Sequence, residues 1–456
     1  MTPGLAAAWS RGKPHADALL RRTLEFARRD TNVVVASVVI TNLLRAGSSV
    51  ILTRLLVPEV FGIAGIIASI SFTLVLVSDL GFQAFVVRHR DGDVPHFLNT
   101  IWTIALARSL LLTGLLAGLS SPIASLTGKP ELAPLIAVSS LTFLLEGLAS
   151  LTLLTALRRR MILRLSVMEV AVMLAQITAA AILAYFWRSY WAILSALLIS
   201  TALRSMLSYL LFPDPFRRIA FDRGYARELW TFARFVTGSS VITMILMQCD
   251  KLILGSLMPL EQFGLYVLAG NLATAPLAFT SAYSSRVLYP RYAQLWRDGG
   301  SDLRQCFYAM RRLPSLLYTF AAGGLIGSAP LIIALLYDHR YAGAATYLQL
   351  LAISSLLSLA SNAANEALTA TGHIRATFQA SLVKLFWLSA GIPAGWYFAG
   401  ALGVVGAVGS MELAAVLFKW LQMHRAALLD FQQEMLFLAA GAAGVATGAC
   451  GAVMFR

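Results

Sequence analysis

Charged residues are scarce in this chain: Asp, Glu, Lys and Arg together make up 13% of it. A soluble globular protein carries about 25%. Hydrophobic residues make up 58%, and the mean hydropathy is +0.73. Soluble domains cannot bury so large a surplus of apolar side chains. The composition therefore excludes a water-soluble protein and predicts one that spans a lipid bilayer.

Cysteine and histidine are also rare. The three cysteines (Cys249, Cys306 and Cys450) have neither a disulfide nor a zinc-ligand spacing, and the six histidines are scattered. We therefore expect no metal and no cofactor. The sequence also lacks a recognisable nucleophile–base pair or phosphate-binding glycine loop, so we expect no enzyme.

Acidic residues are fewer than basic ones, and the net charge is +14. In a soluble protein this excess would suggest nucleic-acid binding. Here the basic residues lie in short segments between apolar runs, which is how Lys and Arg set the topology of a membrane protein. We expect a lipid bilayer, and no nucleic acid, as the partner of these charges.

Runs of about 20 apolar residues, long enough to cross a bilayer as helices, recur along the chain. The last is the least regular because it is rich in small residues. We expect spans at 31–54, 60–80, 97–119, 133–156, 165–186, 190–212, 230–257, 262–288, 314–337, 342–369, 377–399, 402–423 and 434–455.

The loop charges orient these spans with the N-terminus in the cytoplasm. Alternate loops then place nearly all loop arginines, Arg311 among them, on the cytoplasmic side. The opposite side carries only Lys129, Arg188, Arg340 and Arg456. Residues 1–30 are basic and precede the first span. They are expected to form an amphipathic helix on the cytoplasmic leaflet, with a disordered tail as the alternative.

A short motif occurs twice, about 200 residues apart. LLVPEVFGIAG from Leu55 and LMPLEQFGLYV from Leu257 share Glu-x-Phe-Gly at the same offset. A second pair, LIAVSSL from Leu135 and LLAISSL from Leu350, keeps the same order. Both pairs map one span onto the span six later. They predict two six-helix lobes of the same orientation, with a path between them.

Several longer pieces carry a family resemblance, namely TRLLVPEVFGIAG from Thr53, SDLGFQAFVVR from Ser78, QCDKLILGSLMPLEQFGLYVLA from Gln248 and NEALTATGHIR from Asn365. With these pieces the chain resembles the polysaccharide transporter branch, the Wzx-type flippases, of the multidrug/oligosaccharidyl-lipid/polysaccharide exporter superfamily. The resemblance covers spans 1 to 12.

The resemblance implies an all-α bundle of 12–14 spans in a bacterial inner membrane. It further implies a flippase for an undecaprenyl-pyrophosphate-linked oligosaccharide, working by alternating access in exopolysaccharide, capsule or O-antigen synthesis beside polymerase or export machinery. We divide the chain into a basic segment (1–30), an N-lobe (31–213), a C-lobe (214–425) and an additional C-terminal span (426–456).

Charges deep inside the expected spans are candidates for the transport path, because such residues normally face a bundle interior or cavity. Arg45 and Arg108 lie near the middle of spans 1 and 3, Lys384 is less deep in span 11, and Arg234 is one turn into span 7. Guanidinium groups suit a pyrophosphate, so these residues are predicted to bind substrate. The alternative is ion pairing within the membrane, with Glu146 or Glu412 as the carboxylates.

A second set of polar residues is predicted to act in gating or ion coupling. Asp250 and Lys251 lie toward the outer end of span 7, where they could pair across the lobes or with each other. Glu146 and Glu412 are candidates for proton coupling. Asn362 and Glu366 share a face of span 10, where they could bind a cation or only join helices.

Two other functions remain open from the sequence. A multidrug or cation antiporter of the related branch should line its cavity with acidic residues, whereas the deep charges here lean basic. A membrane-embedded polymerase or ligase would need a large outer loop, and the outer loops here are short.

Overall fold

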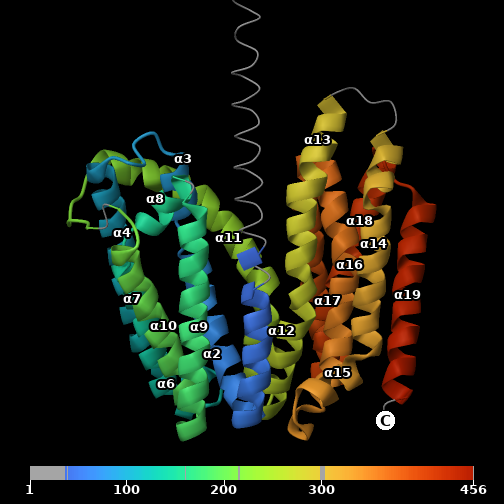
Figure 1. Cartoon of the computed structure of the whole chain (residues 1–456), viewed down its shortest axis with the longest axis horizontal. Coiled ribbons are helices and arrows are strands. Elements are labelled where there is room, and N and C mark those ends of the chain that lie inside the picture. The colour runs from blue at the N-terminus through green and yellow to red at the C-terminus, as the bar shows by residue number, and fades with distance from the viewer. Residues whose placement is uncertain (1–35, 38–39, 160, 214–215, 298–302, 455–456) are drawn as a thin grey trace, which may run out of the picture.

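A computed structural model describes residues 36–37, 40–159, 161–213, 216–297 and 303–454. The basic segment predicted over 1–30 lies outside these residues. Every regular element in the described ranges is a helix, as the composition predicted. The helices form two side-by-side groups, an N-lobe and a C-lobe (Figure 1).

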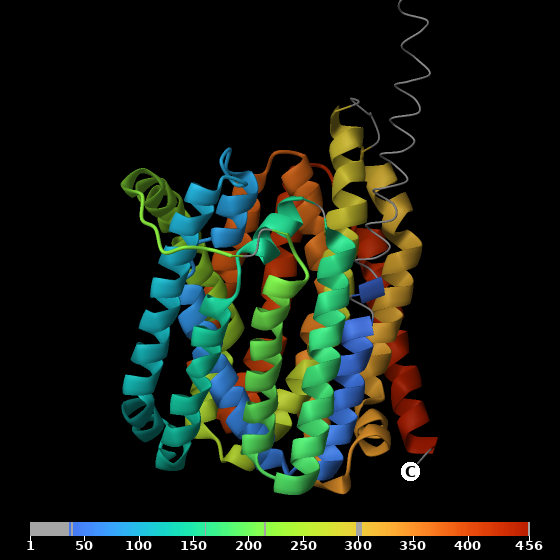
Figure 2. The same cartoon turned by 60° about the vertical axis from the view of Figure 1, so that its left-hand side comes forward.

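The N-lobe begins with a helix over 40–55. It continues with α2 (Pro58–Val77), α3 (Phe82–Arg88), α4 (Pro95–Gly118), α5 (Ser120–Leu126), the 3₁₀-helix η1 (Pro130–Leu132), α6 (Ala133–Ser139), α7 (Leu141–Leu148), α8 (Thr152–Arg158), α9 (Ile162–Trp187) and α10 (Tyr190–Leu210). Its long helices stand side by side in Figure 2, where α4 packs on α7, and α10 on α7 and α9.

The C-lobe is built from α11 (Arg223–Leu257), α12 (Leu260–Tyr283), the π-helix η2 (Ser284–Leu288), α13 (Tyr289–Arg297), α14 (Leu303–Gly327), α15 (Ala329–Leu336), the 3₁₀-helix η3 (His339–Tyr341), α16 (Ala344–Ala370), α17 (Ile374–Gly409), α18 (Met411–Arg425) and α19 (Phe431–Met454). Here α16 is central, since it contacts α12, α14, α17 and α18.

The two ends of the bundle differ in the segments that they carry. The short helices α3, α8 and α13, which belong to the basic loops, lie together at one end (Figure 1). The helices α6 and α15 and the C-terminus lie at the other. We call these the basic end and the opposite end. The arrangement agrees with the alternation of loops that the charge pattern predicted.

Ten helices in the described ranges are long and apolar enough to span a membrane, or eleven if the bent pair α14–α15 forms one span. One of the ten runs from 374 to 425 and holds two expected spans. The chain reverses at Ala399–Gly400, where Gly400 takes φ 56°, a conformation that favours glycine. Beyond the turn, the backbones of Gly395 and Gly403 lie in contact.

Two expected spans have the wrong boundaries. The span predicted over 133–156 leaves its helix after Leu148, and α8 follows as a separate short helix. The span predicted over 314–337 begins earlier, at Leu303, and bends by 69° between α14 and α15. Hydropathy averages over such breaks, because the residues on both sides are equally apolar.

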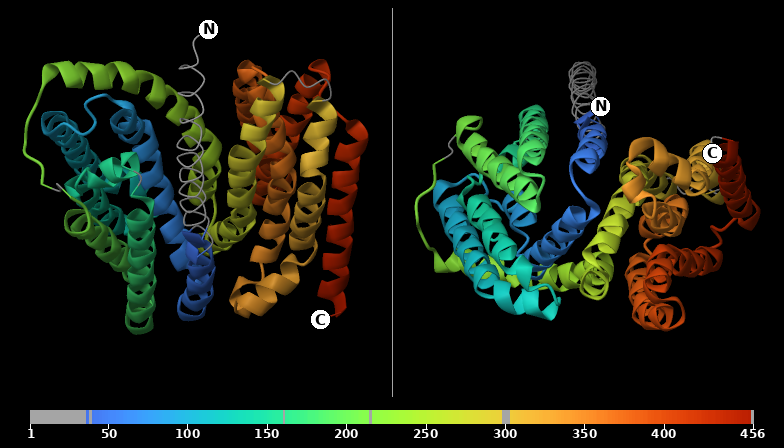
Figure 3. Two further views of the ribbon diagram at one scale, coloured as in Figure 1. Left: turned by 45° about the horizontal axis from the view of Figure 1, so that its top comes forward. Right: turned by 90° about the horizontal axis from the view of Figure 1, so that it is seen from below.

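The last helix, α19, packs along α14. Glycines on both helices allow this close approach. A Cβ on Gly444 of α19 would overlap the carbonyl of Phe320, and a Cβ on Gly327 of α14 would overlap the carbonyl of Val445. Small residues that let backbones approach are typical of helix pairs in membranes. Figure 3 shows α19 upright at the edge of its lobe. The small-residue run is therefore a full helix of the bundle.

Candidate functional site

The two copies of the repeated motif touch each other where the lobes meet. A Cβ on Gly62 of α2 would overlap the carbonyl of Leu260, and a Cβ on Gly264 of α12 would overlap that of Pro58. Each glycine thus contacts the residue that lies four positions before the other glycine in the sequence. An approximate two-fold relation between the two motif copies requires this pattern. This contact lies toward the opposite end of the bundle, beside the turns that precede α2 and α12.

Two side chains reach across the lobes around this contact. The Lys129 Nζ, from the N-lobe, donates hydrogen bonds to the carbonyls of Gly255 (2.5 Å) and Met258 (3.2 Å) at the end of α11. The Tyr341 hydroxyl, from the C-lobe, donates to the carbonyl of Leu56 (2.8 Å) just after the helix over 40–55. Each donor satisfies carbonyls that a helix end leaves without a partner.

These two bonds are counterparts of each other. Lys129 precedes η1 and Tyr341 ends η3, the 3₁₀-helices that lead into spans 4 and 10. Their acceptors lie at the end of the first helix of the opposite lobe. We name the two bonds the crossed caps. Sequence analysis missed both donors, since Lys129 was read only as a loop charge and a single tyrosine gives no signal.

Asp250 and Lys251 do not pair across the lobes. The Tyr266 hydroxyl of α12 donates to the Asp250 carboxylate, which is 7% exposed. Both residues line a cavity of about 290 Å³ that C-lobe helices form together with Phe72 of α2, and Gln248, Asn271 and Thr274 also contribute polar atoms. Among the described residues, Asp250 and Lys251 form no ion pair, either across the lobes or with each other.

Arg108 binds the end of α2. Its guanidinium donates to the carbonyls of Ser78 (2.7 Å) and Val75 (3.0 Å) and to the Ser78 hydroxyl (2.8 Å). Glu146, on the neighbouring α7, lies within electrostatic range of Arg108 and Arg204. Arg108 therefore closes a helix end, a role that the sequence could not reveal because Ser78 is 30 residues away.

The loop after α2 also contacts α11. The Thr237 hydroxyl donates to the Asp79 carbonyl (2.7 Å), and the Ser240 hydroxyl donates to the Asp79 carboxylate (3.1 Å). Gly81 has φ 68° and lies against Phe232. The piece SDLGF thus joins α2, α3 and α11.

Arg45 is exposed, one turn before Ser49 on the same helix face. The Ser49 hydroxyl is 3.2 Å from the Tyr337 hydroxyl of the C-lobe. Arg45 therefore lies on the face that turns toward the C-lobe, one turn closer to the basic end. Arg234 is also exposed, on α11.

Lys384 forms an ion pair with Glu412, joining α17 to α18. This is the intramembrane pairing that the sequence left open as an alternative. Lys419, which sequence analysis did not single out, lies nearby and is 5% exposed. Its ammonium donates to the carbonyl (3.1 Å) and hydroxyl (2.9 Å) of Ser361. Glu366 is within electrostatic range of Lys419.

Asn362 joins two helices, since its amide donates to the Thr280 hydroxyl of α12 (3.1 Å). A second buried pair was not predicted at all. Arg311, assigned to a cytoplasmic loop, is 1% exposed and pairs with Glu434 of α19. That assignment was wrong because α14 already begins at Leu303, so Arg311 lies two turns inside the helix.

The basic end holds a network of its own. The Arg158 guanidinium donates to the carbonyls of Val87 (2.9 Å) and His89 (2.5 Å) and to the Asp93 carboxylate (2.8 Å). Burial acts to raise the pKa of Asp93, but hydrogen bonds from Arg159 and Arg158 outweigh it and leave that pKa below its ordinary value. The Tyr225 hydroxyl donates to Asp91, which ties the loop to α11.

Over the described residues, no three His, Cys, Asp or Glu side chains come together as a metal site would require. The arrangement allows relative movement of the lobes. They are in contact at the opposite end through glycines and the crossed caps, whereas at the basic end the first half of α11 lies against the N-lobe and the other C-lobe helices stand apart from it (Figure 1). Contacts of this kind can break and re-form without unfolding either lobe.

Known proteins share this sequence pattern and this fold. The family described as polysaccharide biosynthesis protein matches residues 51–346, more than half of the chain. The lipopolysaccharide biosynthesis protein WzxC of Escherichia coli (strain K12) is 23% identical over 356 residues, which cover 78% of this chain and 72% of WzxC.

Solved structures show the same fold at low identity. The lipid II flippase MurJ, in an inward closed conformation, matches with a TM-score of 0.70 at 11% identity, covering 92% of this chain and 91% of that chain. An inward-facing multidrug resistance MATE family transporter of the MOP superfamily matches with a TM-score of 0.61 at 13% identity, covering 85% and 95%. This multi-pass membrane chain, with its two helical lobes, belongs to the family of polysaccharide biosynthesis proteins.

Proposed function

We propose that the chain is a flippase that carries an undecaprenyl-pyrophosphate-linked oligosaccharide across the bacterial inner membrane by alternating access. Membership of a polysaccharide biosynthesis family supports the substrate class. The likeness of its fold to that of a lipid II flippase supports the mode of action. The basic end faces the cytoplasm in this proposal, and a polymerase or export machinery receives the product outside.

The observation that carries the proposal is the one-sided contact between the lobes. The crossed caps and the Gly62–Gly264 contact hold the lobes together at the outer end. Toward the cytoplasm only the first half of α11 lies against the N-lobe, and the other C-lobe helices stand apart from it (Figure 1). A carrier that loads its substrate from the cytoplasmic side requires this asymmetry, and rocking of the lobes would reverse it.

Arg45 is the substrate contact that we favour, because it is exposed on the face of its helix that turns toward the other lobe. A guanidinium at this depth would replace part of the hydration of a pyrophosphate. Arg108 is the weaker candidate, since its donors already hold α2. Lys384 and Arg234 are kept as further basic contacts.

Ion coupling is proposed for the C-lobe. The Lys384–Glu412 pair, with Lys419 and Glu366 beside it, and the Asp250 cavity, with Lys251, are the buried polar groups that a driving cation could displace. Asn362 and Glu146 are the remaining candidates. A Glu412→Gln variant should then lose the dependence of export on an ion gradient, whereas unchanged dependence would remove Glu412 from this role.

Deletion of the gene tests the function itself. A lipid-linked oligosaccharide should accumulate on the cytoplasmic leaflet, and the intact gene should restore export. Absence of any accumulation, together with new drug sensitivity, would contradict the proposal and favour a multidrug antiporter.

Complementation with Arg45→Ala tests the cationic path. Export should fall at least tenfold while the protein reaches the membrane in normal amount. Arg54→Ala is the matched control, because Arg54 is exposed on the opposite face of the same helix, nine residues away. Full export by Arg45→Ala, or equal loss in both variants, would argue against Arg45 as a substrate contact.

A further inference from the structure

A second hollow lies at the basic end, at the other end of the bundle from the Gly62–Gly264 contact. It occupies about 660 Å³ between the end of α3 and the first half of α11. This volume falls within the range of small-molecule sites, about 300–1,000 Å³. Its charged lining residues are Arg88 and His89 from the α3 end, and Arg227 and Glu228 from α11.

The charges in this hollow leave two cations available. The His89 imidazole is hydrogen-bonded to the Glu228 carboxylate (2.9 Å), so the acid already has a partner. Arg88 is held over the Phe232 ring, its guanidinium carbon 5.5 Å from the ring centre. Within the described ranges, neither the Arg88 nor the Arg227 guanidinium forms an ion pair.

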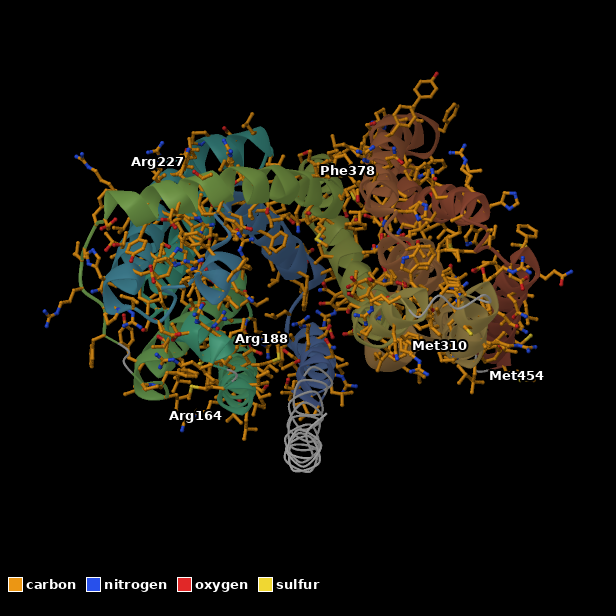
Figure 4. The ribbon with its side chains drawn as sticks, turned by 90° about the horizontal axis from the view of Figure 1, so that it is seen from above. Arg164, Arg188, Arg227, Met310, Phe378 and Met454 are labelled. Carbon is orange, nitrogen blue, oxygen red and sulfur yellow. The ribbon has the colours of Figure 1, made fainter. Side chains whose placement is uncertain are left out.

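We expect the hollow at the level of the lipid headgroups. The 35 residues of α11 measure about 52 Å at 1.5 Å per residue, well beyond the roughly 30 Å hydrocarbon core. Figure 4 shows its first half, from Arg227, running across the basic end. Trp230 on this half is 71% exposed, as expected of a side chain at the membrane–water interface.

We propose that this hollow binds the phosphate group of a phosphorylated lipid in the cytoplasmic leaflet, and that it is the first docking site for the diphosphate of the lipid-linked substrate. Two guanidinium groups, one of them fixed against a ring, provide bidentate donors for phosphate oxygens. This inference rests on the proposed function for the identity of the lipid. The site is distinct from Arg45, which lies on the helix over 40–55.

Binding is measured on the full chain in nanodiscs of phosphatidylcholine, titrated with undecaprenyl diphosphate. Arg88→Gln and Arg227→Gln should each weaken binding at least tenfold, because each removes charge-assisted hydrogen bonds. Arg223→Gln is the control, since Arg223 is exposed on the same helix but does not line the hollow. Equal weakening in the control would reveal only general attraction to a basic surface and would overturn the proposal.

Glu228→Gln gives a result that misfolding cannot imitate. It can keep the hydrogen bond to His89 but removes the one carboxylate among the described residues that line the hollow, so the diphosphate should bind severalfold more tightly. Unchanged or weaker binding by this variant, in a protein with normal thermal unfolding, would contradict a phosphate site here.

A second titration separates the two sources of lipid phosphate. Phosphatidylglycerol should compete for the hollow weakly, requiring at least tenfold more lipid than undecaprenyl diphosphate. Equal competition would make this a site for bulk anionic lipid and overturn the docking role. Because binding is measured without transport, a chain that binds the diphosphate at Arg88 and Arg227 but exports no glycan would refute the flippase function and leave the site standing.

Discussion

At the scale of single residues, several basic side chains bind helix ends or loops and do not line a transport path. Arg108, Arg158 and Lys129 each donate to backbone carbonyls at a helix end or in a loop. A cation is suited to this position because the carbonyl end of a helix carries partial negative charge. The basic composition thus serves the contacts between elements as well as the topology.

Lys129→Met should weaken the contact between the lobes at the opposite end, because the carbonyls of Gly255 and Met258 lose their donor. The methionine keeps the approximate length of the side chain. A hydrogen bond from a charged group contributes about 1.5–3 kcal/mol. We expect the population with separated outer ends to rise at least tenfold, measured by distances between spin labels on the two outer loops. Ser125→Ala in α5 is the control, because the exposed Ser125 hydroxyl donates within its own helix, to the Pro122 carbonyl. Identical distance distributions in Lys129→Met and wild type would show that this cap does not set the closure.

Asp93 gives the basic end a dependence on pH. Its pKa is lowered in the fold, so its charged form stabilises the loop at neutral pH. That contribution is complete above the ordinary value of about 4 and is lost as the pH falls through the lowered value. Hydrogen exchange of residues 86–93 should therefore accelerate only on strong acidification.

Asp93→Asn should abolish that acid response at a cost of about 0.2–1 kcal/mol, as for exposed ion pairs. Arg158→Ala should cost more, about 1.5–3 kcal/mol in local opening, since the carbonyls of Val87 and His89 also lose a charged donor. Exchange that is equally fast in both variants would contradict this ranking.

That these charges lie within helices could be predicted from the sequence, but among their partners only the carboxylates Glu146 and Glu412 were considered. Arg108 and Lys384 were recognised because a charge inside an apolar run is conspicuous. Which way each side chain turns depends on helices that are distant in sequence, such as Ser78 for Arg108. Lys419 escaped notice because it lies close to the expected end of its span, yet the fold buries it.

At the scale of elements, α19 shows how a run rich in small residues packs closely into the bundle. Along these two helices, glycines from α14 and from α19 in turn contact the backbone of the other helix. The Arg311–Glu434 ion pair joins the basic ends of the two helices. Breaking a buried ion pair by removing one partner costs about 3–5 kcal/mol. Thirteen runs could be predicted from hydropathy, but this mode of packing needs the partner helix.

Gly444→Leu should separate α19 from α14, because the new side chain would overlap the backbone of Phe320. Overpacking of this kind costs about 1–3 kcal/mol, and the thermal unfolding temperature in detergent should fall by several degrees. Gly451→Leu on the same helix is the control, since no atom lies within 4 Å of a Cβ there. Equal stability of the two variants would contradict close packing at Gly444.

At the scale of the whole molecule, the repeat does more than duplicate a lobe. The Glu-x-Phe-Gly motif predicted two copies of one unit, and the structure brings the two copies into contact with each other. Sequence similarity could not predict that contact, because it compares residues without placing them in space. The crossed caps follow the same relation, although a lysine and a tyrosine share no sequence likeness.

Gly62→Val should prevent the outer ends from closing, because Leu260 of the other lobe occupies the space that a side chain needs. Export should fall more than tenfold while the protein still reaches the membrane. Gly114→Val, on a helix of the N-lobe with open space around it, should retain export. Normal export by Gly62→Val would show that this contact is dispensable for transport.

The contact between the motif copies also bears on how the protein is made. The ribosome completes α2 about 200 residues before α12, so the glycine face of α2 enters the membrane with its partner still unsynthesised. During that interval lipid must cover a surface shaped for Leu260 and Gly264. We therefore expect the N-lobe to mature in two stages, with its opposite end reaching its final packing only when α12 has been inserted.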